Sequence, residues 1–398
     1  FIVDLEKTVI PNLIEACDEI IANPDGYDGL IEFMGRQTFL KGVKGLGTIG
    51  YARDFTPGEC APYTAPPPSE GNIYLASGLK SKKLKVREPI DQRCWAFLKE
   101  LRERNATQRI YEVNPYAEVY QLRENVYGIF TESLGGAGDV WSYLVMGPEK
   151  AMLIDTGYGV GDLKGLVNEL TGGMPLIVAN THAHPDHANG NCQFERVYCH
   201  EYTVPLLEEA RKPLVYDQLF DAQGQPIWTV FDRRDIVPFQ EYEIVGCPDS
   251  YVFHLGGDYE VELVWTAGHA AGHCMFLDKK SRLLFAGDDA VSMRINIGGP
   301  RPGDPYGQYA TVVAYRDQMA KLAARLDEFD YVFSGHFVYD LENYVIADLA
   351  EAAEAIMANP QSYSYAEMAQ TPAGVVTRYH KFVKGLGTLA YTESAVRG

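Results

Sequence analysis

The sequence predicts a layered α/β protein, and three features support this prediction. The chain has 398 residues, of which 46% are hydrophobic and 22% charged, enough to build a large buried core. From about residue 112, short apolar runs end at glycine or polar turns, as β-strands do. Helical patterns at 160–170, 203–211 and 310–326 alternate with these runs, which is typical of α/β layers. The expected strands are Asn125–Thr131, Trp141–Met146, Ala151–Ile154, Leu176–Ala179, Val261–Trp265, Leu283–Ala286 and Tyr331–Phe333.

The two ends of the chain contain an internal repeat. Residues 1–24 and 337–360 are identical at 13 of 24 positions, and KGVKGLGT at 41–48 matches KFVKGLGT at 381–388 at seven of eight. Each copy has a helical pattern with apolar side chains on one face, and each pattern ends at Asn-Pro. We therefore expect 1–51 to form a helix and then a strand that duplicate 337–391.

The repeat suggests how the chain is organised. Residues 1–51 look like the tail of a preceding domain, and 52–111 like the former connection, a Pro-rich linker followed by a short helix near 91–104. The catalytic domain is then 112–391. Because the apolar face of 1–51 must be buried, we expect this N-terminal module to pack on the catalytic domain or on a second subunit of a homo-oligomer.

Charge and composition exclude several classes of protein. The chain carries 35 Lys and Arg against 54 Asp and Glu, a net charge of −19, so neither nucleic acid nor a membrane surface is an expected partner. No apolar run approaches the ~20 residues of a membrane span, and the start lacks the pattern of a signal peptide. Seven cysteines without a C-x-x-C pair argue against a disulfide framework. We expect a cytoplasmic protein that acts on a small molecule.

One short motif carries the chemistry. The sequence His182-Ala183-His184-Pro185-Asp186-His187 follows an expected strand and places three imidazoles and a carboxylate within six residues. Two histidines at i and i+2 of an extended segment point to the same side and can hold one metal ion. After the turn at the proline, Asp186 and His187 point to a second position nearby. The motif thus predicts ligands for two metals.

Three more candidate ligands lie further along the chain. His269, Asp288 and His336 each come directly after an expected strand and a glycine. The carboxyl ends of neighbouring strands meet at one edge of a sheet, where α/β proteins place their sites. Four such signals in order favour ligation over isolated strand-end residues.

The ordered set H-x-H-x-D-H, Gly268-His269, Gly287-Asp288 and Gly335-His336 resembles the metallo-β-lactamase fold superfamily over about residues 112–391. The resemblance implies an αβ/βα sandwich with a dinuclear site at its edge, here with an N-terminal extension. It further implies that Asp288 bridges the metals and that Asp155 orients a ligand histidine. The implied ligands of one metal are His182, His184 and His269, and those of the other are Asp186, His187 and His336.

The resemblance also narrows the reaction. Gly268-His269-Ala270-Ala271-Gly272-His273 is similar to the G-H-x-x-G-H of glyoxalase-II-like thioesterases and of lactonases. It implies a hydrolase that opens a small ester, lactone, thioester or amide with a hydroxide shared by two divalent ions, with Zn²⁺ favoured and iron or manganese as alternatives. Asp186 is the candidate proton acceptor. The alternatives are an iron-dependent persulfide dioxygenase, a phosphodiesterase of the same fold, or a scaffold with a vestigial site.

Substrate contacts are the least specified part of the prediction. In lactonase-like relatives a tyrosine between the last two ligands can donate to the substrate carbonyl, and Tyr315 is the best match, with Tyr309 as its rival. Core packing is the alternative for both tyrosines. Arg294 and Arg301 can hold a carboxylate or lie solvated, and His273 can support a ligand, face the substrate or pack in the core.

Overall fold

A computed structural model describes most of the chain. The described residues are 9–33, 36–43, 47–51, 62–63, 85–86, 106–131, 140–213, 220, 224, 229–230, 233–298, 304–371, 374–384 and 386–397. The predicted helix near 91–104, most of the Pro-rich linker and Arg301 lie outside these residues. In the described part of the chain, none of the helices combines the length and hydropathy needed to cross a bilayer.

The chain divides into two compact units. Unit 1 comprises Phe1–Pro67 and Tyr365–Arg378, and unit 2 comprises Pro68–Ser364 and Tyr379–Gly398. Unit 2 contains all of the candidate ligands.

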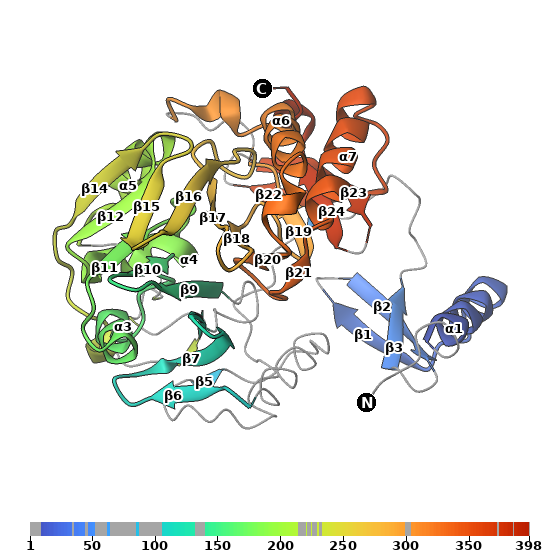
Figure 1. Ribbon diagram of the computed structural model, residues 1–398. Coiled ribbons are helices and arrows are strands. Elements are labelled where there is room, and N and C mark those ends of the chain that lie inside the picture. Colours follow the sequence, from blue (N-terminus) through green and yellow to red (C-terminus); the bar gives the residue numbers. More distant parts are fainter. Residues whose placement is uncertain are drawn as a thin grey trace. The chain divides into compact units, whose positions relative to one another are not determined.

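The first sheet of unit 2 has eight strands in the order β14-β12-β11-β10-β9-β8-β7-β6 (Figure 1). The strands from β6 to β10 pair antiparallel, and those from β10 to β14 pair parallel, so the ligand motif follows a parallel strand. The strands are β6 (Arg109–Tyr111), β7 (Asn114–Arg123), β8 (Val126–Thr131), β9 (Val140–Met146), β10 (Ala151–Ile154), β11 (Leu176–Ala179), β12 (Arg196–His200) and β14 (Glu243–Cys247).

The second sheet has six strands in the order β15-β16-β17-β18-β20-β21. Its one parallel pair joins β18 to β20, and these two strands lead to Asp288 and His336. The strands are β15 (Val252–Gly256), β16 (Tyr259–Trp265), β17 (Cys274–Asp278), β18 (Leu283–Gly287), β20 (Tyr331–Ser334) and β21 (Leu341–Glu342). A short pair, β5 (Lys85–Val86) with β13 (Thr229–Val230), lies outside both sheets.

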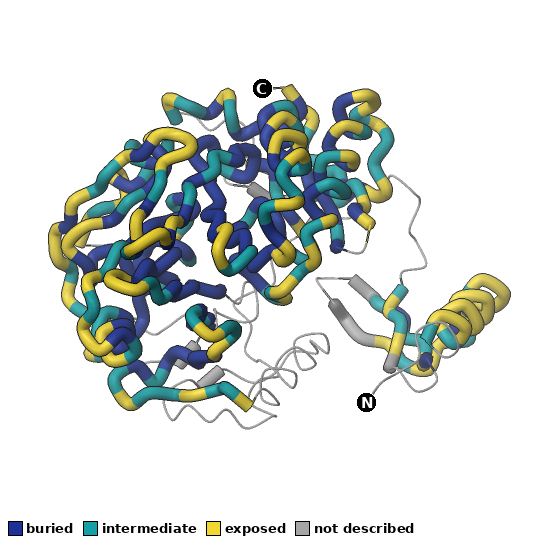
Figure 2. Tube along the Cα trace, viewed as in Figure 1, coloured by how far each residue is buried: buried dark blue, intermediate teal, exposed yellow. Residues whose placement is uncertain are grey.

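Unit 2 is a four-layer sandwich. A core of buried aromatic and aliphatic side chains lies between the two sheets, and it includes Phe130 and Tyr143 from the first and Phe285 from the second. The outer face of the first sheet is covered by α3 (Leu163–Thr171), with α4 (Pro185–Ala188) and α5 (Val204–Ala210) further along the chain. The outer face of the second sheet is covered by α6 (Val312–Ala323) and α7 (Val345–Ala358) (Figures 1 and 2). The predicted αβ/βα sandwich is confirmed.

The N-terminal module contains more strands than predicted. Its helix α1 (Ile10–Ala22) is followed by three strands in the order β1-β2-β3, namely β1 (Gly29–Phe33), β2 (Arg36–Val43) and β3 (Gly47–Tyr51). The second copy has the same elements in α7, β22 (Tyr365–Thr371), β23 (Gly374–Val383) and β24 (Gly387–Tyr391). In unit 1, β4 (Pro62–Tyr63) pairs with β22, and in unit 2, β19 (Met293–Asn296) pairs with β24.

The two copies share individual contacts as well as elements. Tyr51 donates its hydroxyl hydrogen to the carbonyl of Pro24 at 2.7 Å, and Tyr391 donates to Pro360 at the same distance. Lys41 and Lys381 donate in the same way to the backbone carbonyls of the turns after each helix. Strand registers agree too, because Val43 faces Gly47 as Val383 faces Gly387, so the duplication extends to the three-dimensional structure. The predicted domain boundaries at 51/52 and 111/112 stay predictions.

The duplicated helices provide a matched test of packing. Leu349 in α7 is fully buried, whereas its counterpart Leu13 in α1 is exposed. Leu349→Ala should lower the free energy of unfolding by about 2–5 kcal/mol because it leaves a cavity, and Leu13→Ala should change it by less than about 0.5 kcal/mol. Urea unfolding followed by circular dichroism measures both. Equal losses would show that α1 is as buried as α7.

Candidate metal centre

The ligand motif lies in the turn between β11 and the short helix α4. His184 is extended (φ −67°, ψ 147°) and precedes the helix, and Pro185 occupies its first turn. The carbonyl of His184 accepts hydrogen bonds from the backbone N–H groups of His187 and Ala188, which fixes the turn. As a result, the side chains of His182 and His184 leave an extended segment, whereas those of Asp186 and His187 leave the helix. The sequence predicted this division of the motif between two adjacent metal positions.

The first candidate group contains His182, His184, His269 and Asp288. His184 Nδ1 lies 2.9 Å from the Nε2 atoms of both His182 and His269. Asp288 Oδ2 lies 3.4 Å from His269 Nε2 and 3.9 Å from His182 Nε2. Three imidazole nitrogens and one carboxylate oxygen therefore converge on one point.

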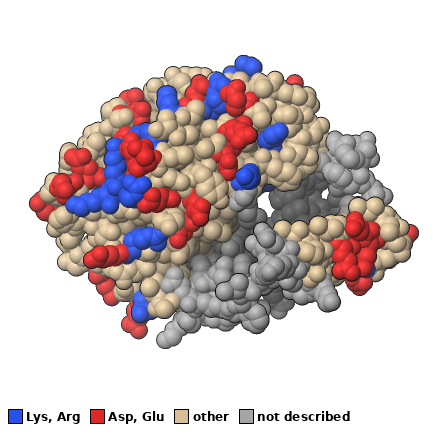
Figure 3. Space-filling model, turned by 45° about the vertical axis from the view of Figure 1, so that its right-hand side comes forward, with Lys and Arg blue, Asp and Glu red and all other residues tan. Residues whose placement is uncertain are grey.

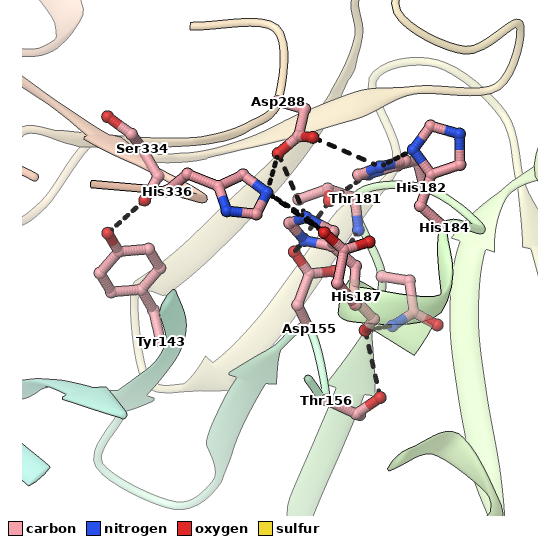
Figure 4. A network of polar contacts seen from close by, with 12 residues as sticks. Tyr143, Asp155, Thr156, Thr181, His182, His184, His187, Asp288, Ser334 and His336 are labelled. Atoms are coloured by element: carbon pink, nitrogen blue, oxygen red, sulfur yellow. Dashed lines mark hydrogen bonds and ion pairs between the residues drawn. The ribbon is translucent and has the colours of Figure 1, made fainter. Parts of the chain in front are cut away.

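The second candidate group contains Asp186, His187 and His336. The Nε2 atoms of the two histidines are 3.1 Å apart, and each lies 3.1 Å from Asp288 Oδ1 (Figure 4). Asp186 Oδ2 lies 3.4 Å from His336 Nε2. Asp288 thus directs one oxygen at each group, which is the arrangement of a bridging carboxylate.

Neighbouring residues fix the protons of the histidines. The buried carboxylate of Asp155 accepts from the hydroxyl of Thr181 and from Nδ1 of His187, both at 2.8 Å. Because the Thr181 hydroxyl hydrogen is used in this way, its oxygen accepts from His182 Nδ1 at 3.0 Å. His269 Nδ1 donates to the carbonyl of Asn296 at 2.7 Å. In their neutral forms these three histidines therefore present bare Nε2 lone pairs to the centre, as metal ligands do.

The charges of the second group are strongly coupled. Burial opposes the charged form of His336, but Asp288 and Asp186 outweigh it and raise its pKa to about 10. Burial likewise opposes ionisation of Asp186, but His187 and His336 lower its pKa to about 2. In the first group, burial lowers the pKa of His182 and of His269. The carboxylates thus require positive charge beside them, which metal ions supply in place of protons.

An orphaned atom gives an independent check of this fit. Asp288 Oδ1 is buried and accepts no hydrogen bond with acceptable geometry, although two imidazole nitrogens lie 3.1 Å away. A buried carboxylate oxygen without a donor is unfavourable unless a cation satisfies it. Nitrogen and carboxylate ligands of this kind suit Zn²⁺, iron or manganese. The residues therefore fit a pair of divalent ions.

Small residues allow the strands to approach the centre closely. Gly287 has φ 49°, and a Cβ atom there would lie 2.7 Å from His273 Nε2 and from Thr181 Cβ. A Cβ atom on Gly335 would lie 2.9 Å from His187 Cε1. A side chain at either position would push a candidate ligand or its support away.

A buried pair behind the centre supports two of the ligands. The Asp289 carboxylate accepts from His273 Nδ1 at 2.7 Å and from the backbone N–H of His269 at 3.2 Å. His273 Nε2 in turn accepts from the backbone N–H of Asp288 at 3.1 Å. Thr266 also donates to Asp289, at 2.6 Å. The pair therefore ties the main chain of a ligand in the first group to that of the bridging carboxylate.

The structure brings all seven predicted ligands together, and their ligand roles stay predictions. Sequence reasoning missed Asp289, because its partners Thr266, His269 and His273 lie far from it in the chain. His273 is fully buried between Asp289 and the backbone of Asp288, a position that favours support of a ligand. Arg294 is exposed. Tyr309 is half-buried and stacks on Tyr202 at 5.1 Å.

For Tyr315 the structure favours the alternative of core packing, and the substrate-binding role stays a prediction. Its side chain is fully buried in α6, and the hydroxyl donates to the backbone carbonyl of Asp289 at 2.6 Å. A Cβ atom on Gly268 would lie 2.6 Å from the ring, so the tyrosine packs directly against the backbone before His269. Tyr315 thus packs in the core behind the centre, next to the backbone of Asp289 and Gly268.

The fold and the centre define the class of protein. A family model described as the metallo-beta-lactamase superfamily matches residues 135–336, half of the chain, and contains every candidate ligand. The chain belongs to this superfamily.

The chain is also similar to several named proteins. The human and bovine proteins named acyl-coenzyme A thioesterase MBLAC2 are each 28% identical over 234 residues, which cover 55% of this chain and 78% of theirs. Among solved structures, DIM-1 metallo-beta-lactamase exposed to ceftazidime is 21% identical and covers 61% of this chain and 98% of its own, with a TM-score of 0.42. A metallo-beta-lactamase from Pontibacter korlensis is 17% identical over 60% of this chain and 99% of its own, with a TM-score of 0.41.

Asp289→Asn should weaken the centre without touching a ligand. In the variant, the asparagine amide presents N–H groups to donors that face a carboxylate in the unsubstituted protein. We therefore expect a stability loss of about 1–3 kcal/mol and a 10- to 100-fold loss of metal affinity. Asp278→Asn is the matched control. Asp278 is an equally buried carboxylate outside the centre, and it accepts a 2.6 Å hydrogen bond from the hydroxyl of Tyr259. Chelator competition measures the affinity. The same affinity loss in both variants would contradict the support role.

Tyr315→Phe should lower stability and leave the chemistry intact. Removing the hydroxyl leaves the buried carbonyl of Asp289 without its donor, at a cost of about 1–3 kcal/mol. Thermal unfolding and steady-state kinetics of the metal-loaded protein measure the two effects. A fall in turnover of roughly 100-fold or more at unchanged stability, the size expected for a lost oxyanion donor, would return Tyr315 to the active site.

Proposed function

We propose that the protein is a dinuclear metal-dependent hydrolase that cleaves acyl thioesters. The observation that carries the proposal is the position of Asp288, whose two oxygens face two separate groups of ligands. A structural metal site closes its ion with four protein ligands, whereas seven ligands shared by two ions leave positions for water and substrate.

This chain's own residues hold and orient the reacting groups. His182, His184 and His269 would hold one ion, and Asp186, His187 and His336 the other, with Asp288 between them. When bound, such ions supply Lewis acidity toward a carbonyl and lower the pKa of water toward neutrality.

Asp186 is the residue proposed to accept the proton. Its side chain is 21% exposed, against 13% for Asp288, so it is the more accessible of the two carboxylates. His187 and His336 hold the pKa of Asp186 low against the effect of burial, so its carboxylate is ionised at neutral pH, which a proton acceptor requires.

A cavity beside the centre supports the choice of an acyl substrate. It is bordered by the candidate ligands His184 and His269, and small apolar side chains form much of its wall. These apolar residues are Ala183, Pro185, Leu206, Ala210, Ala270, Ala271 and Ala310. Such a lining suits an unbranched hydrocarbon chain next to the carbonyl to be attacked.

Charge and kinship point the same way. The cavity wall combines one cation, Lys212, with the acids Glu209 and Asp304, so the cavity itself suits the uncharged acyl part of a thioester rather than a phosphate-bearing part. Figure 3 shows acidic and basic side chains interspersed over the described surface of unit 2, without a continuous basic stretch on that face. The named relatives are acyl-coenzyme A thioesterases, which supports a thioester as the bond that is cleaved.

Turnover of acyl-coenzyme A thioesters by the zinc-loaded protein tests the proposal. Alongside these we would measure lactone, β-lactam and phosphodiester substrates. His184→Ala and Asp288→Asn should each lower turnover at least ~100-fold, since loss of a mere supporting partner already costs 10- to 100-fold. His254→Ala is the control, because His254 is an exposed histidine outside the centre. Asp186→Asn should reduce turnover more than metal content.

Other outcomes would redirect the assignment. One iron per chain with oxygen consumed in turnover would favour the dioxygenase alternative. Hydrolysis of phosphodiesters without thioester turnover would favour a phosphodiesterase. Activity retained by metal-free Asp288→Asn protein would overturn the dinuclear mechanism.

A further inference from the structure

The N-terminal module exposes a face that its duplicate buries. In α1, the side chains of Leu13 and Ile21 are 37% and 76% exposed, whereas their counterparts Leu349 and Met357 in α7 are 0% and 8% exposed. Ile10 and Ile14 are also exposed, so α1 presents a contiguous apolar face. Within unit 1, no described residue covers this face. Soluble proteins rarely leave such a face open unless it binds a partner.

The second copy shows what kind of partner fits this face. The buried side of α7 packs in one core with α6, where Met319 and Leu322 meet the cluster that contains Leu349. Because α1 has the same apolar spacing and its module the same backbone contacts, the helix complementary to its face is one of the α6 type.

The strands carry a second, independent signal. In the second copy, β24 pairs with β19 in parallel, with Ile295 opposite Leu389. In the N-terminal module, β3 is the edge of its sheet and pairs with β2 alone among the described strands. An edge strand is a template for one more strand. The module therefore lacks the equivalents of both α6 and β19, which in unit 2 come from the single stretch between Asp288 and His336.

We propose that residues 9–51 are an interaction module that completes a metallo-β-lactamase-type domain lacking its own C-terminal helix and strands. The module would cover the α6-type helix of that domain with α1 and pair with its β19-type strand through β3. This chain's α6 and β19 are already covered by α7 and β24, and those of an intact second copy are covered in the same way. The partner is thus a domain of this superfamily that ends at its last histidine ligand.

A fusion tests the proposal with the full chain. Residues 106–336 are placed directly before Phe1, so that Phe1 follows the added His336 as Phe337 does in the natural chain. The module should then complete the added domain. We expect the added domain to resist trypsin like unit 2 and the fusion to bind twice the divalent metal of the unextended chain.

Two variants of the fusion locate the interface. Leu13→Asp with Ile21→Asp places charges on the exposed face and should make the added domain at least about tenfold more sensitive to trypsin and remove its extra metal. Asn12→Asp is the matched control, because the second copy carries Asp348 at the equivalent position, and it should behave like the parent fusion.

Three results would overturn the proposal. The first is equal trypsin sensitivity of the added domain with and without the double substitution. The second is an added domain that is cleaved at once in the parent fusion. The third is a dimer of the unextended chain, seen by sedimentation, that the double substitution dissociates, because this would assign the face to a second copy of the chain.

Discussion

The centre depends on bringing bare nitrogen and oxygen lone pairs together in a buried place. In their neutral forms, His182, His187 and His269 present unprotonated nitrogens to the centre, because Thr181, Asp155 and Asn296 accept the proton on the other ring nitrogen of each. Lone pairs packed at 2.9–3.1 Å repel one another unless positive charge lies between them. Both sheets, the short helix α4 and the close-packed glycines hold these side chains in place around a centre that could hold metal ions.

Much of this arrangement could be predicted from the sequence, because ligands at strand ends leave a local signature. His269, Asp288 and His336 each follow an apolar run and a glycine, and that pattern is readable without coordinates. The side of a helix that faces the core is harder to read. Tyr315 lies among alternating apolar and polar residues of α6, and its spacing alone fits either a core position or one facing a substrate. Burial, which only the packed structure reveals, decided between them.

The strands of the N-terminal module were underestimated for a related reason. β2 contains Arg36, Gln37, Lys41 and Gly42, so its alternation is weak and its apolar content low. Pairing to β1 and β3 on both sides makes it a strand, and pairing is a non-local property. Asp289 escaped notice because its partners Thr266, His269 and His273 are about 20 residues away in the chain.

Asp155 contacts residues of both candidate groups, and this limits how the centre can evolve. One carboxylate accepts from the hydroxyl that positions His182 in the first group and from the ring of His187 in the second. A substitution at Asp155 therefore disturbs both groups at once. If the centre binds two ions as proposed, a variant that keeps a single ion would arise more easily by replacement of a proposed ligand such as Asp186 than by a change at Asp155, which supports both groups.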